Sequence, residues 1–88
     1  MLDYKIIVDK LNEALFFVSE ELSENQINFI RSDINAGEWR LAFETLCDIL
    51  SEENLRMNPR VYKLVQEIGY GLNIDSETWE SLKVQVAC

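Results

Sequence analysis

The stretch from residue 34 to residue 50 constrains the fold more than any other part of the chain. It contains Gly37, a residue that tolerates the positive φ at which helices often end. Beyond this glycine, apolar residues recur at helical spacing and form one stripe of Trp39, Ala42, Phe43, Leu46 and Leu50. Leu41 and Ile49 lie outside that stripe. A helix that is apolar on more than one side has neighbours on several sides, so residues 38–52 are predicted to form a central helix.

Two further apolar stripes precede this central helix. Residues 2–20 carry the first one, which consists of Ile7, Leu11, Ala14, Leu15 and Val18. Ile6, Phe16 and Phe17 are expected to widen this stripe within the core. An anchor for a partner or a membrane is the alternative for Phe16 and Phe17, but no Lys/Arg cluster accompanies them. A second helix is predicted to start after Ser23, because Ser23 and Gln26 match a capping box, and to end at Gly37.

The last third of the chain predicts two more helices. Asn58 and Pro59 mark a helix start, followed by a stripe of Val61, Leu64, Val65, Ile68 and Leu72. Gly69 weakens this helix, and close packing is the expected reason for it. Asp75 and Ser76 offer a cap for a short helix with Trp79, Leu82 and Val86. No segment alternates like a half-buried strand. The chain is therefore predicted to form a single small all-α domain, residues 1–88, a compact bundle of about five helices around the central one.

The charge balance limits the partners of such a domain. The chain has 16 Asp and Glu residues against 8 Lys and Arg, which gives a net charge of −8. This charge repels nucleic acid and anionic membranes and favours cationic partners, although it also keeps a small protein soluble. The sequence contains no apolar run long enough to cross a membrane, and its start does not resemble a signal peptide. We therefore expect a cytoplasmic protein.

The residue types on which most enzymes and metal sites depend are scarce. The chain has no histidine, the commonest general base and metal ligand. Its two cysteines cannot make a zinc site. Cys47 is expected to be a small buried apolar residue, and Cys88 is assigned no function. No Gly-rich phosphate loop or calcium loop occurs. The sequence therefore predicts a protein that is not an enzyme and has no cofactor and no metal.

Acidic residues on the central helix form a candidate binding site. Glu44, Asp48 and Glu52 follow one another at intervals of four, so they share one side of the helix. Leu41 lies one turn earlier on nearly the same side, and acids beside an apolar residue suit a basic partner surface. The full candidate site consists of Asp33, Glu38, Leu41, Glu44, Asp48 and Glu52. The alternative is a solvated side that binds nothing, with Leu41 buried under the first or last helix.

Basic residues concentrate at a different place in the sequence. Arg56, Arg60 and Lys63 surround a predicted helix start, where the helix dipole disfavours cations. We expect them to pair with Glu52 and Glu53, which come just before them. Contact with an acidic patch on a partner is the alternative.

Several runs of the sequence also carry a family resemblance. These runs are Leu22-Ser23-Glu24-Asn25-Gln26-Ile27, Phe29-Ile30, Gly37-Glu38-Trp39-Arg40-Leu41-Ala42-Phe43-Glu44-Thr45-Leu46-Cys47, Ile49-Leu50, Tyr62, Ile68-Gly69 and Trp79. Together they resemble the MafI family of bacterial immunity proteins over residues 20–82. Trp39 stands where that family pattern has a tyrosine, and Phe43 where it has an aliphatic residue.

This resemblance implies a small α-helical cytoplasmic protein that binds and neutralises the C-terminal domain of a secreted bacterial toxin. Such polymorphic toxins act in contact-dependent growth inhibition between neighbouring bacteria, and their toxic domains are often nucleases. The implied partner is therefore a basic toxin domain, without direct binding to nucleic acid or to a membrane. The protein itself is expected to be a monomer or a weak homodimer. A small helical adaptor or regulatory domain without a toxin partner is the alternative function.

Overall fold

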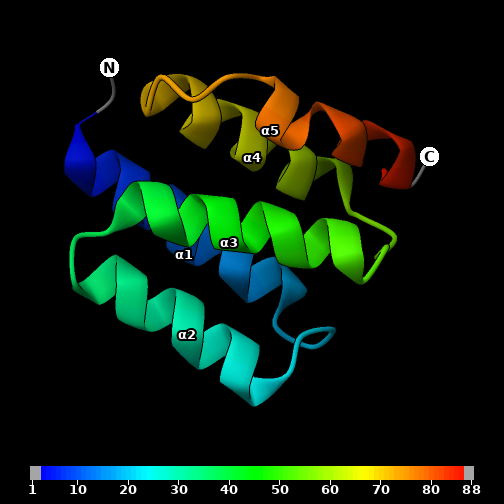
Figure 1. Cartoon of the computed structure of the whole chain (residues 1–88), viewed down its shortest axis with the longest axis horizontal. Helices are drawn as coiled ribbons and strands as arrows, with labels where there is room; N and C mark the ends of the chain where they lie inside the picture. The colour runs from blue at the N-terminus through cyan, green and yellow to red at the C-terminus, as the bar shows by residue number, and fades with distance from the viewer. Residues whose placement is uncertain (1–2, 87–88) are drawn as a thin grey trace.

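The computed structural model describes residues 3–86, and helices account for most of them (Figure 1). The helices are α1 (Tyr4–Val18), α2 (Glu24–Asn35), α3 (Trp39–Glu52), α4 (Pro59–Gly71), α5 (Glu77–Glu80) and the 3₁₀ helix η1 (Ser81–Gln85). The only strand-like feature of these residues is an isolated bridge between Met57 and Val86. The predicted all-α fold is therefore confirmed. None of the described helices is long and apolar enough to cross a bilayer.

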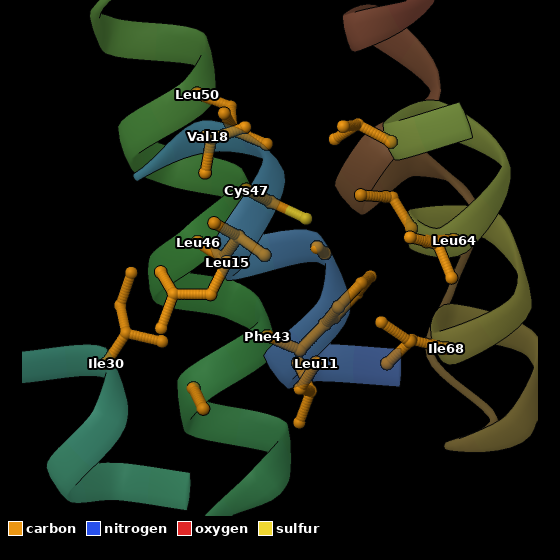
Figure 2. Close-up of a cluster of buried hydrophobic side chains, with 14 of the residues drawn as sticks. Leu11, Leu15, Val18, Ile30, Phe43, Leu46, Cys47, Leu50, Leu64 and Ile68 are labelled. Carbon is orange, nitrogen blue, oxygen red and sulfur yellow. The ribbon is translucent and has the colours of Figure 1, made fainter. Parts of the chain in front are cut away.

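Helix α3 occupies the middle of the bundle, as the sequence predicts. Figure 1 shows it between α2 on one side and α4 with α5 on the other, and α1 passes behind it. Its buried residues are Ala42, Phe43, Leu46, Cys47 and Leu50. They share one core with Leu11 and Leu15 of α1, Ile30 of α2 and Leu64 and Ile68 of α4, and Figure 2 shows all of these side chains except that of Ala42 with labels. Trp39, which was expected to be largely buried, is half-buried, and its ring stacks on that of Tyr4 at 5.5 Å between centroids.

The helix boundaries follow local signals in the sequence. The Ser23 hydroxyl accepts a hydrogen bond from the Gln26 backbone N–H, and the Gln26 side chain accepts one from the Ser23 N–H, which completes the predicted capping box. Gly37 has a φ of +77°, the left-handed conformation that glycine adopts without strain beyond the end of a helix. Asn58 caps α4 through the Arg60 N–H, and Pro59 is its first residue.

Close packing explains why α4 contains Gly69. A methyl group at this position would overlap the six-membered ring of Trp79 from α5, because the two residues are in direct contact. Trp79 is fully buried, and its ring meets that of Phe43 edge-on, with 5.9 Å between the centroids. The glycine therefore lets α5 approach α4 and α3 closely enough to bury the largest side chain of the core.

Two details of the ends of helices differ from the predictions. Ile6, Phe16 and Phe17 were expected in the core, but they are 44%, 74% and 41% exposed, because α1 turns only its Ile7–Val18 stripe inward. The predicted last helix is also shorter than expected: the chain tightens into η1 after Glu80, and Val86 lies beyond it in extended conformation. Cys88 lies outside the described residues.

Candidate functional site

The exposed side of α3 carries four of the candidate residues. Leu41 is 48% exposed, so the alternative in which it lies buried under the first or last helix is wrong. Asp48 and Glu52 are exposed and Glu44 is half-buried. A side chain on a helix shares its side with residues three, four, seven and eleven positions away, so these four side chains form one stripe. We call this stripe, made of Leu41, Glu44, Asp48 and Glu52, the α3 acidic stripe.

The carboxylates of the acidic stripe make no ion pair with any described cation. Within the described residues, the ion pairs join Lys10 to Glu67 at 3.0 Å and Arg60 to Glu13 at 3.1 Å, and both connect α1 with α4. The Lys10 ammonium lowers the pKa of the Glu67 carboxyl, and the Glu13 carboxylate raises the pKa of Arg60. No described cation comes within ion-pair distance of the acidic stripe. Its carboxylates therefore make no ion pair within residues 3–86, and the described cation that shares their helix is Arg40, one turn before Glu44.

The predicted pairing of the basic residues with Glu52 and Glu53 is wrong. Arg60 stands in the first turn of α4, and α4 packs along α1, so its guanidinium reaches Glu13 through both Nε and a terminal nitrogen. Glu53 accepts a hydrogen bond from Gln26 instead. Arg60 thus pairs with an acid of α1 and not with the acids at the end of α3.

The two remaining candidate residues flank the turn between α2 and α3. Glu38 is exposed just before α3, where its side chain makes no capping hydrogen bond. Its negative charge is favourable there because the N-terminus of a helix carries partial positive charge. Asp33 is half-buried, and its Oδ2 is inaccessible and lacks a hydrogen-bond partner within residues 3–86. The structure therefore places Glu38 beside the open surface and Asp33 mostly beneath it.

The thiol next to the acidic stripe is unsuited to chemistry. Cys47 is buried as expected, and burial, reinforced by the carboxylates of Asp48 and Glu44, raises its pKa to about 12. A thiol with such a pKa is almost never a thiolate, the form that acts as nucleophile or metal ligand. Cys47 thus behaves as a small apolar core residue.

Two hollows of the described surface lie away from the acidic stripe. One hollow of about 310 Å³ lies between the α3–α4 loop and the end of η1, and one of about 200 Å³ between that loop and the end of α1. Arg56 borders both. Residues 3–86 contain no group of three or more potential ligands arranged to hold a metal ion. The stripe itself offers carboxylates and apolar carbons on an open helix surface, groups suited to contact with a cationic protein surface.

One exposed residue of α2, the helix that packs beside α3, is missing from the candidate list. Phe29 of α2 is 60% exposed. The sequence does contain a signal for it, because the α2 stripe of Ile27, Ile30 and Ile34 leaves Phe29 on another side of the helix.

Comparisons with known proteins identify no relative of this chain. The chain matches no family model, no curated protein and no solved structure. Its function must therefore be argued from its own residues.

Proposed function

We propose that this protein is an immunity protein of the MafI type, which binds the toxic C-terminal domain of a cognate bacterial toxin and blocks it stoichiometrically. The observation that carries the proposal is the α3 acidic stripe, where Leu41 is exposed beside a row of three carboxylates that make no ion pair with any described cation. The resemblance of residues 20–82 to that family supports it independently.

The charge of the stripe explains how such inhibition works. A toxin domain that cleaves nucleic acid needs cations along its active cleft to hold phosphates. Carboxylates placed in that cleft occupy the phosphate sites without being cleaved. They also accelerate association with a cationic surface, most strongly at low salt. Inhibition then requires contact alone, and the protein performs no reaction.

A second candidate function is that of a helical adaptor for another cellular protein. The observation that favours it is the exposed pair Phe16 and Phe17, whose rings lie edge-on 6.2 Å apart at the end of α1. An adaptor would bind through this pair and not through the α3 acidic stripe. Neighbouring genes discriminate between the two functions, because an immunity gene lies directly beside a toxin gene.

The test of the proposed function is co-expression with the C-terminal domain of the toxin encoded beside this chain. Survival of the cells is expected with the wild-type protein. The double variant Glu44→Lys and Asp48→Lys is then expected to bind that domain more slowly and to lose the salt dependence of the association rate. Circular dichroism and melting temperature establish that the variant is folded. Unprotected cells in the presence of the wild-type protein would contradict the immunity function.

An unchanged affinity and salt dependence in the folded double variant would contradict only the assignment of the site. The toxin domain would then bind elsewhere, for example around Glu20, Glu21 and Glu24, or across Asp75, Glu77 and Glu80.

A further inference from the structure

Phe29 of α2 has an environment that the fold does not explain. Its side chain is 60% exposed, whereas Ile30 and Ile34 of the same helix are buried. At an exposed helical position, phenylalanine has a lower helix propensity than alanine. It also leaves apolar surface in water, which the folded chain gains nothing from. A single exposed ring is ordinary on a protein surface, so what distinguishes Phe29 is its position relative to the α3 acidic stripe.

The register of α2 against α3 places Phe29 at the edge of the α3 acidic stripe. The Gln26 side chain donates a hydrogen bond to the Glu53 carboxylate at 3.4 Å, and the Asp33 carbonyl accepts one from the Glu38 N–H at 2.9 Å. The start of α2 thus meets the end of α3, and the two helices run in opposite directions side by side (Figure 1). Phe29 lies between Gln26 and Asp33 on the same side of α2, one turn from each.

This register sets Phe29 opposite the second half of the stripe. The two helices are antiparallel, so moving one turn forward along α2 from Gln26 corresponds to moving about one turn back along α3 from Glu53. This brings Phe29 level with the turn of α3 that contains Ile49 and Glu52. Leu41 lies in the first turn of α3, at the other end of the stripe. Phe29 and Leu41 are the exposed large apolar side chains of α2 and α3 within residues 3–86. The acids of the stripe lie between them.

The charge around these two apolar residues determines what covers them. A second copy of the chain would bring its own acidic stripe against this one. Like charges that face each other across an interface weaken the affinity. A cationic protein surface meets no such repulsion. The partner that fits has lysine and arginine side chains opposite the stripe and an apolar hollow where the phenyl ring lies.

We propose that the toxin-binding surface extends from α3 onto α2, and that Phe29 is its apolar anchor, inserted into a hollow that lysine and arginine residues surround on the toxin domain. This proposal rests on the proposed function. In it the two kinds of residue have separate roles. The acids of the stripe set the association rate through long-range attraction, and Phe29 sets the dissociation rate through short-range contact.

The test measures association and dissociation rates of the full chain with the purified C-terminal domain of the toxin encoded beside it, at several salt concentrations. Phe29→Ala is expected to raise the dissociation rate about thirtyfold, as loss of an anchor residue does, and to change the association rate less than about twofold. Its salt dependence stays that of the wild type. Phe29→Leu keeps an apolar side chain, so its dissociation rate is expected to lie between those of the wild type and Phe29→Ala.

Phe16→Ala is the matched control. Phe16 is 74% exposed on α1, on the side opposite the buried Ile7–Val18 stripe, so the same substitution removes an exposed ring from a different helix. It is expected to leave both rates unchanged. The melting temperature of Phe29→Ala should equal or exceed that of the wild type, because alanine favours the helix.

Three outcomes overturn the proposal. A dissociation rate of Phe29→Ala within about twofold of the wild type, less than any anchor residue gives, excludes Phe29 as the anchor and leaves the proposed function intact. Equal losses in Phe29→Ala and Phe16→Ala move the site to another surface. Absence of binding by the wild-type protein overturns the proposed function together with this proposal.

Discussion

The two sides of α3 are interleaved along the same 14 residues, but one side faces the core and the other faces solvent. One side, with Phe43, Leu46 and Leu50, is fully buried against α1, α2 and α4. The other side, the α3 acidic stripe, is exposed or half-buried, and its carboxylates make no ion pair with any described cation. One helix therefore both organises the fold and presents a row of three carboxylates on its outer side.

The difference shows which residues of α3 the fold requires. Removing a buried leucine side chain from water contributes about 1.5–3 kcal/mol, so the inward side accounts for much of the stability of a small domain. The acids of the stripe contribute nothing comparable: like charges four residues apart destabilise a helix by about 0.2–0.5 kcal/mol per pair. The sequence of the stripe thus opposes the stability of its own helix, and this is why we assign a binding role to it.

The largest expected effect is that of Leu46→Ala on the buried side. Leu46 is inaccessible to solvent, and its removal leaves a cavity that the surrounding helices only partly fill. We expect a loss of about 2–5 kcal/mol in the free energy of unfolding. Thermal unfolding followed by circular dichroism should show a melting temperature lower by at least about 10 °C. A melting temperature equal to that of the wild type would contradict the central position of α3.

Gly69→Ala is expected to have the next largest effect, because the new methyl group displaces the Trp79 ring that packs on Phe43. Overpacking of this kind costs about 1–3 kcal/mol. Denaturant unfolding followed by tryptophan fluorescence measures it. In a Trp79→Phe background the same substitution should cost less, since the smaller ring leaves room for the methyl group. Equal costs in both backgrounds would show that the glycine serves another purpose.

The features of the fold that the sequence predicts correctly are those decided by nearby residues. Ser23 with Gln26, and Asn58 with Pro59, lie within one helical turn of each other, so their capping roles can be read from the sequence. The buried stripe of α3 follows from helical periodicity. Gly69 was also assigned to close packing correctly, although nothing in the sequence identifies Trp79 as its contact.

The features that the sequence does not predict depend on how helices are placed around one another. Arg60 pairs with Glu13, which is 47 positions away, and not with the nearby Glu52 or Glu53. Phe16 and Phe17 look like core residues by composition, but α1 turns them outward. The same distinction applies to the candidate site. The sequence predicts that the α3 acids share one side of their helix, because this depends on spacing within one helix. It does not predict where Phe29 lies relative to them, because this depends on how α2 packs against α3.

A smaller effect, of opposite sign, is expected from Asp48→Lys on the exposed side. This substitution replaces two repulsive pairs, with Glu44 and Glu52, by two attractive ones, and it places a cation in the C-terminal half of the helix. We expect a gain of about 0.5–1 kcal/mol at low salt, measured by denaturant unfolding, and a smaller gain at high salt.

Asp9→Lys on α1 is the control for this gain. Asp9 is exposed one turn from both Lys5 and Glu13, so it has one attractive and one repulsive neighbour. A lysine at this position would be repelled by Lys5 and attracted by Glu13, which again gives one pair of each kind. Its stability should remain close to that of the wild type. A loss of stability in Asp48→Lys would mean that the stripe stabilises α3, and the contrast between the two sides would no longer hold.

The smallest expected effect on stability is that of Leu41→Ala. This substitution has the same chemistry as Leu46→Ala, five positions away on the same helix, but Leu41 is 48% exposed, and alanine and leucine are both good helix formers. The free energy of unfolding should therefore change by less than about 0.5 kcal/mol. Denaturant unfolding of the two variants side by side measures the contrast directly. If Leu41→Ala costs more than about 1 kcal/mol, Leu41 is held by packing within the fold, beyond the range of ordinary surface substitutions. If its cost is small while toxin binding weakens, the fold does not need this leucine and the partner does.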